Sequence, residues 1–258
     1  MPPLPPDNNP TAENTASKPD FAVSVRNLSK RFGDFTAVDD ISFDVRPKEI
    51  FGFLGANGAG KTTTIKMLTG LLQPSAGQGQ VGGLDIVRQS ARIKTRIGYM
   101  SQRFSLYDDL KARENLFFFG GVYGLDRRQV ARRMEELEGV LHLSEIQHHL
   151  TGSLPLGYKQ RLALACAILH QPPILFLDEP TGGVDPIARR HFWDLISTLA
   201  AGGTTVFVTT HYMDEAEYCH RLSIMYSGRI VDLEAPAALK QKYGMKSIED
   251  IFVHLVDR

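Results

Sequence analysis

The chain has 258 residues, of which 43% are hydrophobic and 22% charged, and its 29 Lys and Arg balance its 29 Asp and Glu to a formal charge of +0. This composition is typical of an ordinary folded protein and excludes a collagenous or largely disordered one. The balanced charge offers no basic surface of the kind that binds nucleic acid, so we expect no nucleic-acid partner. Two cysteines, Cys166 and Cys219, make no disulfide framework, which favours a reducing compartment.

The N-terminal segment is rich in proline, with five prolines before Thr11, and continues with small polar residues. Such a segment buries too little apolar surface to offset the entropy lost on ordering, so we predict a disordered tail over residues 1–20. It lacks the charged start and apolar centre of a secretory signal. The apolar stretch from Leu116 to Leu125 is too short for a membrane span and holds three glycines, so we expect no transmembrane segment.

From Phe21 onward, short apolar runs alternate with longer helical stretches, which is typical of a parallel sheet covered by helices. Ile41, Phe43 and Val45 alternate with polar residues, as in a strand with one buried face. Three continuously apolar runs predict strands that are buried on both faces. These runs are residues 50–54, 174–177 and 206–208. The predicted fold class is α/β.

Between Gln102 and about residue 167 the pattern is helical, and we predict a helical subdomain inserted into the sheet domain. An apolar stripe recurs there at steps of three and four residues and comprises Val130, Met134, Leu137 and Leu141. Four arginines share the polar side with glutamates. They are Arg127, Arg128, Arg132 and Arg133. We interpret them as a solvated helix face, with a phosphate-contact patch as the alternative.

The segment from Gly55 to Thr62 has the sequence Gly-Ala-Asn-Gly-Ala-Gly-Lys-Thr, between a predicted strand and a predicted helix. This is the pattern of a phosphate-binding loop in its required context. Its glycines let backbone N–H groups point inward, and the helix N-terminus adds partial positive charge. Lys61 is expected to contact the β- and γ-phosphates and Thr62 to bind Mg²⁺. The predicted nucleotide-binding residues of the loop are Gly55, Asn57, Gly58, Ala59, Gly60, Lys61, Thr62 and Thr63. A merely flexible turn is the alternative.

Two acids, Asp178 and Glu179, follow a predicted buried strand. Ligands of open α/β sheets bind at that edge, so both acids are expected to face the nucleotide. We predict that Asp178 holds Mg²⁺, directly or through water, and that Glu179 is the general base for the attacking water. An isolated acid pair could instead cap a helix. His211 ends another apolar run and is predicted to sense the γ-phosphate, although a lone histidine is more often a core or surface residue.

Together these motifs resemble the ATP-binding subunits of ABC transporters, across essentially all of residues 21–256. GYMSQ, ending at Gln102, is similar to the family's Q-loop, GGVDP at residues 182–186 to its D-loop, and VTTHYMDEAE to the segment with the switch histidine. The resemblance implies a P-loop NTPase (RecA-like) fold with a mixed sheet core, ATP and Mg²⁺ as cofactors, and a role for Gln102 near Mg²⁺ and the attacking water. Phe32 stands where the family places an aromatic that stacks on adenine, with a core phenylalanine as the alternative.

The family's signature motif, LSGGQ, is replaced here by Leu-Pro-Leu-Gly-Tyr at residues 154–158. In the family, the signature of one subunit closes on the γ-phosphate held by the other, so each site is made from two chains. Pro155 has neither a hydroxyl nor an N–H group, whereas the N–H groups of Leu156 and Gly157 remain available. We expect a composite site that is retained but weakened, or one that faces a partner with an intact signature.

LPLGYKQRLALAC and the nearby FSLYDDL, GVYGL and YMDEAEYC resemble exporter ATPases of the ABC-2 type, including ones with two ATPase units in tandem. The resemblance implies an ATPase at the cytoplasmic face of the membrane that powers export through nucleotide-driven dimer closure and opening. Its partners would be ABC-2-type permease subunits and a second ATPase subunit, identical or different. A soluble ABC ATPase that remodels ribosomes or nucleic-acid complexes is the alternative, and a small-molecule kinase is a third possibility that leaves Gln102 and His211 unexplained.

The predicted domain organisation is an ATPase domain over residues 21–258 with a helical subdomain at about 102–167 and a C-terminal tail helix at about 236–258. The resemblance places the permease contact beside the Q-loop, at Phe104, Leu106, Tyr107 and the 116–123 stretch, for which lobe core is the alternative. For the tail, we favour docking against the core over a partner interface.

Overall fold

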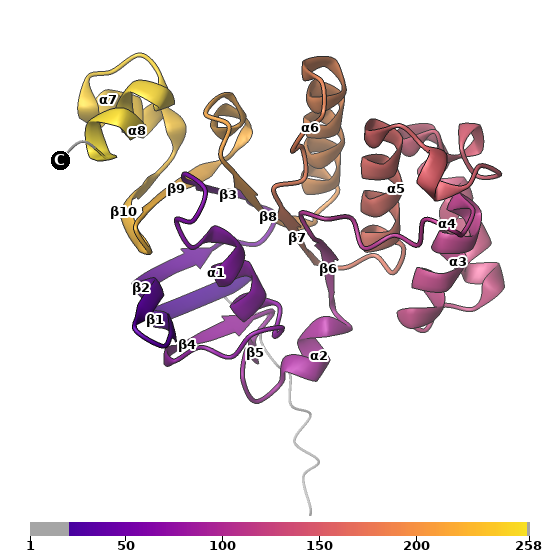
Figure 1. Ribbon diagram of the computed structural model, residues 1–258, viewed down its shortest axis with the longest axis horizontal. Helices are drawn as coiled ribbons and strands as arrows, with labels where there is room; N and C mark the ends of the chain where they lie inside the picture. Colours follow the sequence, from indigo (N-terminus) through magenta and orange to yellow (C-terminus); the bar gives the residue numbers. More distant parts are fainter. Residues whose placement is uncertain (1–20, 257–258) are drawn as a thin grey trace, which may run out of the picture.

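The computed structural model describes residues 21–256, so the tail predicted over residues 1–20 lies outside the described residues. Two β-sheets form the centre of this part of the chain (Figure 1). A four-stranded antiparallel sheet has the order β2-β1-β4-β5, and a six-stranded sheet has the order β10-β9-β3-β8-β7-β6. The strands are β1 (Val23–Phe32), β2 (Phe35–Val45), β3 (Ile50–Leu54), β4 (Ala76–Val81), β5 (Leu84–Asp85), β6 (Ile97–Met100), β7 (Ile174–Asp178), β8 (Thr205–Thr210), β9 (Arg221–Tyr226) and β10 (Arg229–Glu234).

In the six-stranded sheet, β9, β3, β8, β7 and β6 pair in parallel, and β10 adds an antiparallel edge. The three apolar runs predicted as fully buried strands form β3, β7 and β8, and all their residues are buried. The alternation predicted for one half-buried strand is confirmed in β2, where Ile41, Phe43 and Val45 are buried and Ser42 is exposed. The predicted α/β fold class is confirmed, with a mixed sheet core.

A cluster of phenylalanine rings fills the space between the two sheets. Neighbouring rings lie with their centroids 5.2–6.0 Å apart, in tilted and stacked arrangements that favour aromatic pairs. The cluster comprises Phe43 of β2, Phe51 and Phe53 of β3, Phe176 of β7 and Phe207 of β8. Because rings from both sheets take part, this cluster holds the four-stranded sheet against the six-stranded one.

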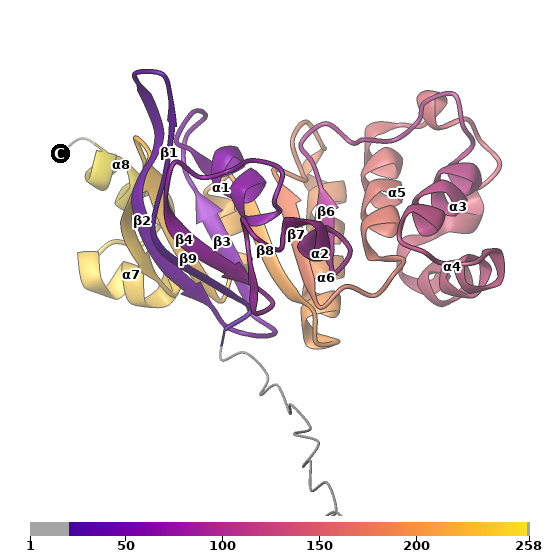
Figure 2. The ribbon, with the colours of Figure 1, turned by 90° about the horizontal axis from the view of Figure 1, so that it is seen from below.

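Eight α-helices flank the sheets in the described part of the chain, and three of them, α3, α4 and α5, contact one another in a lobe at one end of the molecule (Figures 1 and 2). The helices are α1 (Lys61–Leu68), α2 (Ser90–Lys94), α3 (Ala112–Val122), α4 (Arg127–Leu141), α5 (Leu156–Ile168), α6 (Pro186–Ala201), α7 (Pro236–Tyr243) and α8 (Ile248–Val256), with short 3₁₀ turns η1 (Leu143–Glu145), η2 (Thr151–Ser153) and η3 (Asp214–Tyr218). Within residues 21–256, no helix is both long and apolar enough to cross a membrane.

The apolar stripe predicted at residues 130–141 forms the inner face of α4. Val130, Leu137 and Leu141 are buried there, and Met134 is partly buried. Of the four arginines, three are exposed and Arg133 pairs with Glu136 of the same helix. The interpretation as a solvated face is therefore confirmed for the three exposed arginines but not for Arg133, whose side chain is 13% exposed and donates from Nε to the carbonyl oxygen of Leu169 at 3.0 Å.

The C-terminal segment differs from the single tail helix predicted over residues 236–258. Two helices form instead, because the chain turns at Gly244, whose φ of 64° ends α7 in the left-handed conformation that glycine tolerates. Ile248 and Ile251 of α8 are buried in a small core that also holds Leu54 and Leu222. The tail therefore docks against the body of the chain.

Replacing Phe207 by alanine is expected to lower the free energy of unfolding by about 3–5 kcal/mol, because it removes the ring that contacts the other four of the cluster. Phe118→Ala is the control, since that ring is 42% exposed and its loss is expected to cost about 1 kcal/mol or less. Chemical denaturation of both variants measures the difference. Equal losses would contradict the conclusion that this cluster holds the two sheets together.

Candidate functional site

The predicted site residues lie at one edge of the six-stranded sheet. β3, β8, β7 and β6 are adjacent and parallel, so their carboxyl ends meet at the same edge. The Gly55–Thr62 loop follows β3, Asp178 ends β7, His211 follows β8 and Gln102 follows β6. Four segments that are far apart in the sequence are thereby brought together by strand pairing alone.

The loop before α1 has the conformation that its glycines predict. Gly60 precedes the helix with a φ of 106°, and a Cβ at this position would lie 2.5 Å from the carbonyl oxygen of Ala37. Only glycine can both adopt this φ and allow that close approach. The first helical residue is Lys61, so backbone N–H groups at the start of α1 face the loop.

Lys61 is buried at 3% exposure, and its Nζ lies 3.0 Å from Oε1 of Glu179, which is itself 7% exposed. The Nζ also donates to the carbonyl oxygen of Gly55 at 2.7 Å. A buried ammonium is tolerated only when such partners satisfy it. The lysine is thus held inside the loop at the position where the motif predicts a phosphate contact.

The carboxylate of Glu179 is the point where the predicted residues meet. Its Oε2 accepts from Nε2 of Gln102 at 3.1 Å and lies 3.1 Å from Nδ1 of His211, while its Oε1 faces Lys61. The backbone of Glu179 has a φ of 47°, an uncommon conformation for this residue type, and is held there by a hydrogen bond from its N–H to Oγ1 of Thr209. Strain of this kind is frequent at functional sites.

Asp178 has a different environment from Glu179. Its Oδ1 accepts hydrogen bonds from Oγ1 of Thr62 at 3.0 Å and from Oγ1 of Thr209 at 2.8 Å. Burial raises the pKa of the Asp178 carboxyl, against the effect of these two hydrogen bonds, and the nearby Glu179 raises it further. Two hydroxyl groups therefore position Asp178, although its burial disfavours the ionised form of the carboxyl.

Oxygen donors at this point fit Mg²⁺. The ion is usually held by one or two carboxylates together with substrate phosphates and water, and the carboxylate of Asp178 and the hydroxyl of Thr62 lie side by side. Within residues 21–256, no group of three or more His, Cys, Asp or Glu side chains forms a metal cage. A site that relies on phosphate oxygens for its remaining ligands agrees with both findings.

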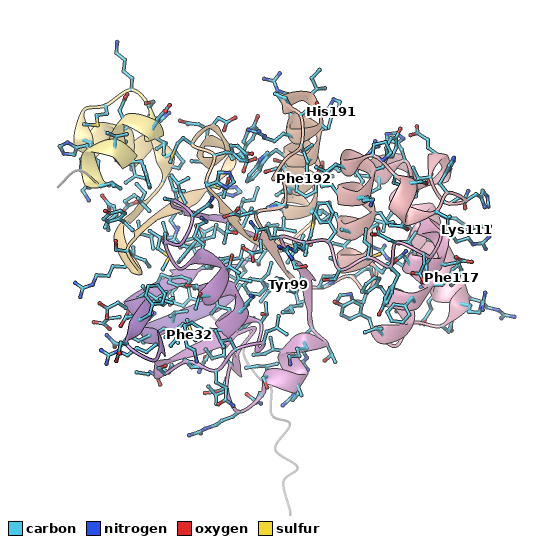
Figure 3. The ribbon with its side chains drawn as sticks, viewed as in Figure 1. Phe32, Tyr99, Lys111, Phe117, His191 and Phe192 are labelled. Carbon is cyan, nitrogen blue, oxygen red and sulfur yellow. The ribbon has the colours of Figure 1, made fainter. Side chains whose placement is uncertain are left out.

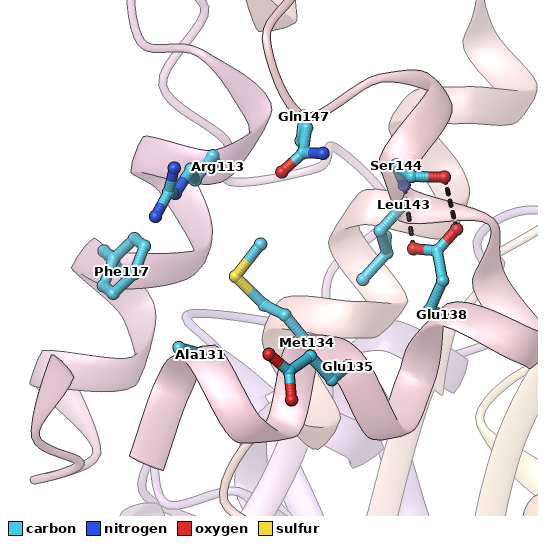
Figure 4. A pocket seen from close by; sticks show the side chains of 9 residues that line it. All are labelled: Arg113, Phe117, Ala131, Met134, Glu135, Glu138, Leu143, Ser144 and Gln147. Carbon is cyan, nitrogen blue, oxygen red and sulfur yellow. Dashed lines mark hydrogen bonds between the residues drawn. The ribbon is translucent and has the colours of Figure 1, made fainter. Parts of the chain in front are cut away.

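A cavity of about 310 Å³ opens over the loop. It is lined by Phe35, Ala37, Asn57, Gly58, Gly60, Lys61, Thr62, Thr63, Gln102 and Glu179. A second hollow of about 300 Å³ lies between α3 and α4, where Met134 faces Phe117 (Figure 4). The two cavities have nearly the same volume, but only the first is lined by predicted site residues.

Two aromatic side chains, Phe32 and Phe35, lie near the phosphate-binding loop on the β1–β2 hairpin. Phe32 is 49% exposed, so it is no core residue, and Lys30 lies over its ring at 5.0 Å. It lies on the four-stranded sheet, at the opposite end of the view from Lys111 and Phe117 (Figure 3). The ring that lines the cavity is that of Phe35, its cross-strand partner across the hairpin turn. Phe35 was not singled out from the sequence, and stacking of Phe32 on adenine stays a prediction.

The signature residues are outside this cavity. Pro155 precedes α5 as its N-cap residue, and it and Leu156 are exposed. The Cβ position of Gly157 faces Ala188 of α6 at 3.7 Å rather than the loop. Figure 3 shows His191 and Phe192 on α6, and both line a small hollow with Gly157. The chain therefore does not bring its own signature to its own phosphate-binding loop.

Sequence comparison decides the family. A family profile described as "ABC transporter" matches residues 38–182, more than half of the chain. The Nod factor export ATP-binding protein I of Paraburkholderia xenovorans (strain LB400) is 40% identical over 222 residues, 86% of this chain and 73% of that protein. The chain belongs to the ABC transporter family. A second profile, described as an AAA domain and putative AbiEii toxin of a Type IV toxin–antitoxin system, matches only residues 152–213 of this cassette.

Other relatives extend the likeness. The probable multidrug ABC transporter ATP-binding protein YbhF of Escherichia coli (strain K12) is 46% identical over 251 residues, which are 95% of this chain and 43% of that protein. The cassette thus spans less than half the length of this relative. The solved structure described as the ATP binding subunit of an ABC transporter superposes with a TM-score of 0.82 at 27% identity, over 91% of this chain and 99% of that one. The P-loop NTPase fold implied by the sequence is thereby confirmed.

Replacing Asp178 by asparagine is expected to stabilise the fold at neutral pH while reducing ATP turnover roughly a hundredfold or more through loss of the carboxylate that is predicted to hold Mg²⁺. The raised pKa of Asp178 means that its ionised form opposes folding, so its contribution to stability is present at low pH and is lost as the pH rises through the folded-state pKa. Asparagine keeps the acceptor for Thr62 and Thr209 without the charge. The gain in melting temperature should therefore shrink in acid.

Asp85→Asn is the matched control for this prediction. Backbone hydrogen bonds from Arg88 and Val87 lower the pKa of Asp85, so the same substitution is expected to reduce stability at neutral pH. Thermal unfolding of both variants at neutral and acidic pH gives the two signs. Destabilisation by Asp178→Asn at neutral pH would show that its carboxylate contributes more to the fold than its burial costs.

Proposed function

We propose that this chain is the ATP-binding and ATP-hydrolysing subunit that powers an ABC-2-type membrane exporter. The observation that carries the proposal is the meeting of Lys61, Gln102 and His211 at the carboxylate of Glu179, at the edge of the sheet where the phosphate-binding loop opens. A charged donor, an amide donor and an imidazole around one carboxylate supply the groups that phosphoryl transfer to water requires.

The chemistry of hydrolysis follows from these positions. Lys61 and the N–H groups at the start of α1 would bind the β- and γ-phosphates of ATP. The Glu179 carboxylate would orient water and take its proton, while His211 would donate a hydrogen bond to the γ-phosphate as charge develops there. Thr62 and Asp178 would hold Mg²⁺, which neutralises phosphate charge when bound.

We also propose that a second cassette is a partner of this chain. Since Pro155, Leu156 and Gly157 lie away from the cavity of their own chain, a site completed by these residues needs a second subunit. The exposed start of α5 presents backbone N–H groups that suit a phosphate. Binding of ATP between two cassettes would favour the closed pair, and hydrolysis would weaken it, which yields a motion.

We further propose that a permease receives this motion beside Gln102, with the cassette at the cytoplasmic face of the membrane. Tyr107, Phe118 and Val122 are 45%, 42% and 62% exposed, so this part of the lobe offers apolar surface. A hollow of about 190 Å³ next to it is lined in part by Phe104 and Leu106, which are partly buried. Part of the predicted contact is therefore accessible, and part belongs to the lobe core.

The names of the relatives support export rather than the alternative of ribosome or nucleic-acid remodelling. The daunorubicin resistance ATP-binding protein DrrA3 of Streptomyces coeruleorubidus is 37% identical over 231 residues, and its name adds resistance to a drug to the multidrug transport and Nod factor export named above. Two of these three names state transport or export, and none names a ribosome or a nucleic acid. Mild detergent extraction of native membranes should recover the chain with a hydrophobic protein, and recovery on ribosomes would contradict the proposal.

Replacing Glu179 by glutamine is expected to leave ATP binding intact and to slow phosphate release by roughly 10²–10⁴-fold, because glutamine keeps the shape but cannot take a proton. Steady-state phosphate release and equilibrium ATP binding separate the two effects. Lys61→Ala is the companion variant, and it should lose ATP affinity instead. Undiminished phosphate release by Glu179→Gln would remove Glu179 from the role of general base.

Replacing Phe32 and Phe35 together by alanine is expected to weaken ATP binding by about 1–3 kcal/mol, roughly 5- to 150-fold, through loss of stacking on the base. Both rings are substantially exposed, so the fold should be unaffected. The affinity for inorganic tripolyphosphate, which has no base, is the control and should not change. The two single variants then show which ring contributes. A double variant with normal ATP affinity would place the base elsewhere.

A further inference from the structure

A buried carboxylate lies outside the site. Glu215 is 0% exposed and lies in η3, after the strand that leads to His211. It neither lines the cavity over the loop nor contacts Lys61 or Glu179. A carboxylate in such a place costs free energy unless hydrogen bonds satisfy it, and apolar residues of the same volume often serve stability as well. Its contacts therefore point to a role beyond packing.

The two oxygens of Glu215 bind two different segments. Oε1 accepts from Oγ1 of Thr181 at 2.5 Å, and Oε2 accepts from Oγ1 of Thr210. Both threonines are 1% exposed. Thr181 lies two residues after Glu179, directly before the turn with the sequence GGVDP, whereas Thr210 is the last residue of β8 and directly precedes His211. One carboxylate thus connects the turn after Glu179 with the strand end before the histidine.

The hydroxyl of Thr210 also fixes the backbone beyond the histidine. Its Oγ1 accepts from the N–H of Tyr212 at 3.0 Å, so the peptide after His211 is tied to the side chain of the residue before it. The ring of Tyr212 packs against the imidazole of His211 with centroids 4.2 Å apart. The guanidinium of Arg189 lies 3.9 Å from the centre of the Tyr212 ring. The histidine is therefore held through its two neighbours.

Arg189 closes the connection, because it belongs to α6, the helix that follows the GGVDP turn. Its Nε is 3.7 Å from Oε1 of Glu215, within ion-pair range but too far for a hydrogen bond. The turn and its helix therefore reach His211 by two routes, through Thr181 and Glu215 and through Arg189 and Tyr212. Any displacement of the turn must change the surroundings of the histidine.

We propose that Glu215 is a positioning residue that couples the GGVDP turn to His211, so that the distance between the imidazole and Glu179 depends on the position of the turn. This rests on the proposed function, because it assigns the coupling to ATP hydrolysis. The turn lies next to the exposed start of α5, since the Cβ position of Gly183 is 3.3 Å from the side chain of Leu156. A second cassette that contacts the start of α5 would thereby influence His211.

The test removes one hydroxyl and keeps the shape. Thr181→Val is expected to lower kcat for ATP by roughly 10- to 100-fold with KM and ATP affinity nearly unchanged, because a small misplacement of a catalytic group affects the reaction more than binding. Thr181→Ser restores the hydroxyl and should restore most of kcat. Adding Glu215→Gln to Thr181→Val should cause little further loss, since both changes break the same connection.

Thr205→Val is the matched control. Thr205 is a buried threonine on the same strand as Thr210, at its opposite end, and its Oγ1 accepts a single hydrogen bond from the N–H of Lys48. The control should lower the melting temperature as much as Thr181→Val without changing kcat. Equal kcat values for the two variants would overturn the proposal, as would a loss of ATP affinity in place of a loss of kcat.

Amide hydrogen exchange tests the connection without activity. In Thr181→Val, exchange of the peptide that contains Tyr212 should accelerate, whereas in Thr205→Val it should match the wild type. If the wild type hydrolyses no ATP but Thr181→Val shows this acceleration, the proposed function fails and the coupling stands. Unchanged exchange at Tyr212 in Thr181→Val shows that Glu215 does not connect the two segments, whatever the activity.

Discussion

Parallel pairing of β3, β8, β7 and β6 is the constraint on which the rest of the structure depends. The register places Leu54 beside Thr210 and Thr209 beside Asp178. A shift of one residue in any of these strands would turn its side chains to the other face of the sheet and separate the groups that meet at Glu179. The complete burial of β3, β7 and β8 fixes this register, because each face of these strands packs against an apolar layer.

At the carboxyl ends of these strands, charged side chains lie buried in the interior, where an unpaired charge is most destabilising. Lys61, Asp178, Glu179 and Glu215 are all less than 10% exposed, and each is satisfied by partners from other segments. The left-handed backbone of Glu179 adds strain at the same point. The phenylalanine cluster between the sheets stabilises the strands without involving the site, and its packing offsets the free-energy cost of the buried charges and the strained backbone.

Hydrogen bonds also connect the site to the surfaces through which a motion would leave it. Gln160 of the signature helix α5 donates to the carbonyl oxygen of Pro180, directly after Glu179. Gln102 connects Glu179 to the segment before α3 and hence to the lobe. A change at the phosphates would therefore reach the lobe and the start of α5 through single residues. Such connections are required if nucleotide binding is to favour one arrangement of the cassettes over another.

The sequence by itself determined the features that depend on local pattern: the buried strands, the amphipathic α4, the glycine-rich loop and the family. Lys61 could be named from the pattern of the phosphate-binding loop, and Asp178, Glu179 and His211 because they stand at or just after the end of an apolar run, since in a parallel sheet such ends converge. Only the tertiary structure decided which side chains touch. Phe35 rather than Phe32 lines the cavity, Glu215 joins two segments, and the signature stays outside its own site. These contacts depend on distances between residues that are remote in the chain, and no local pattern records such distances.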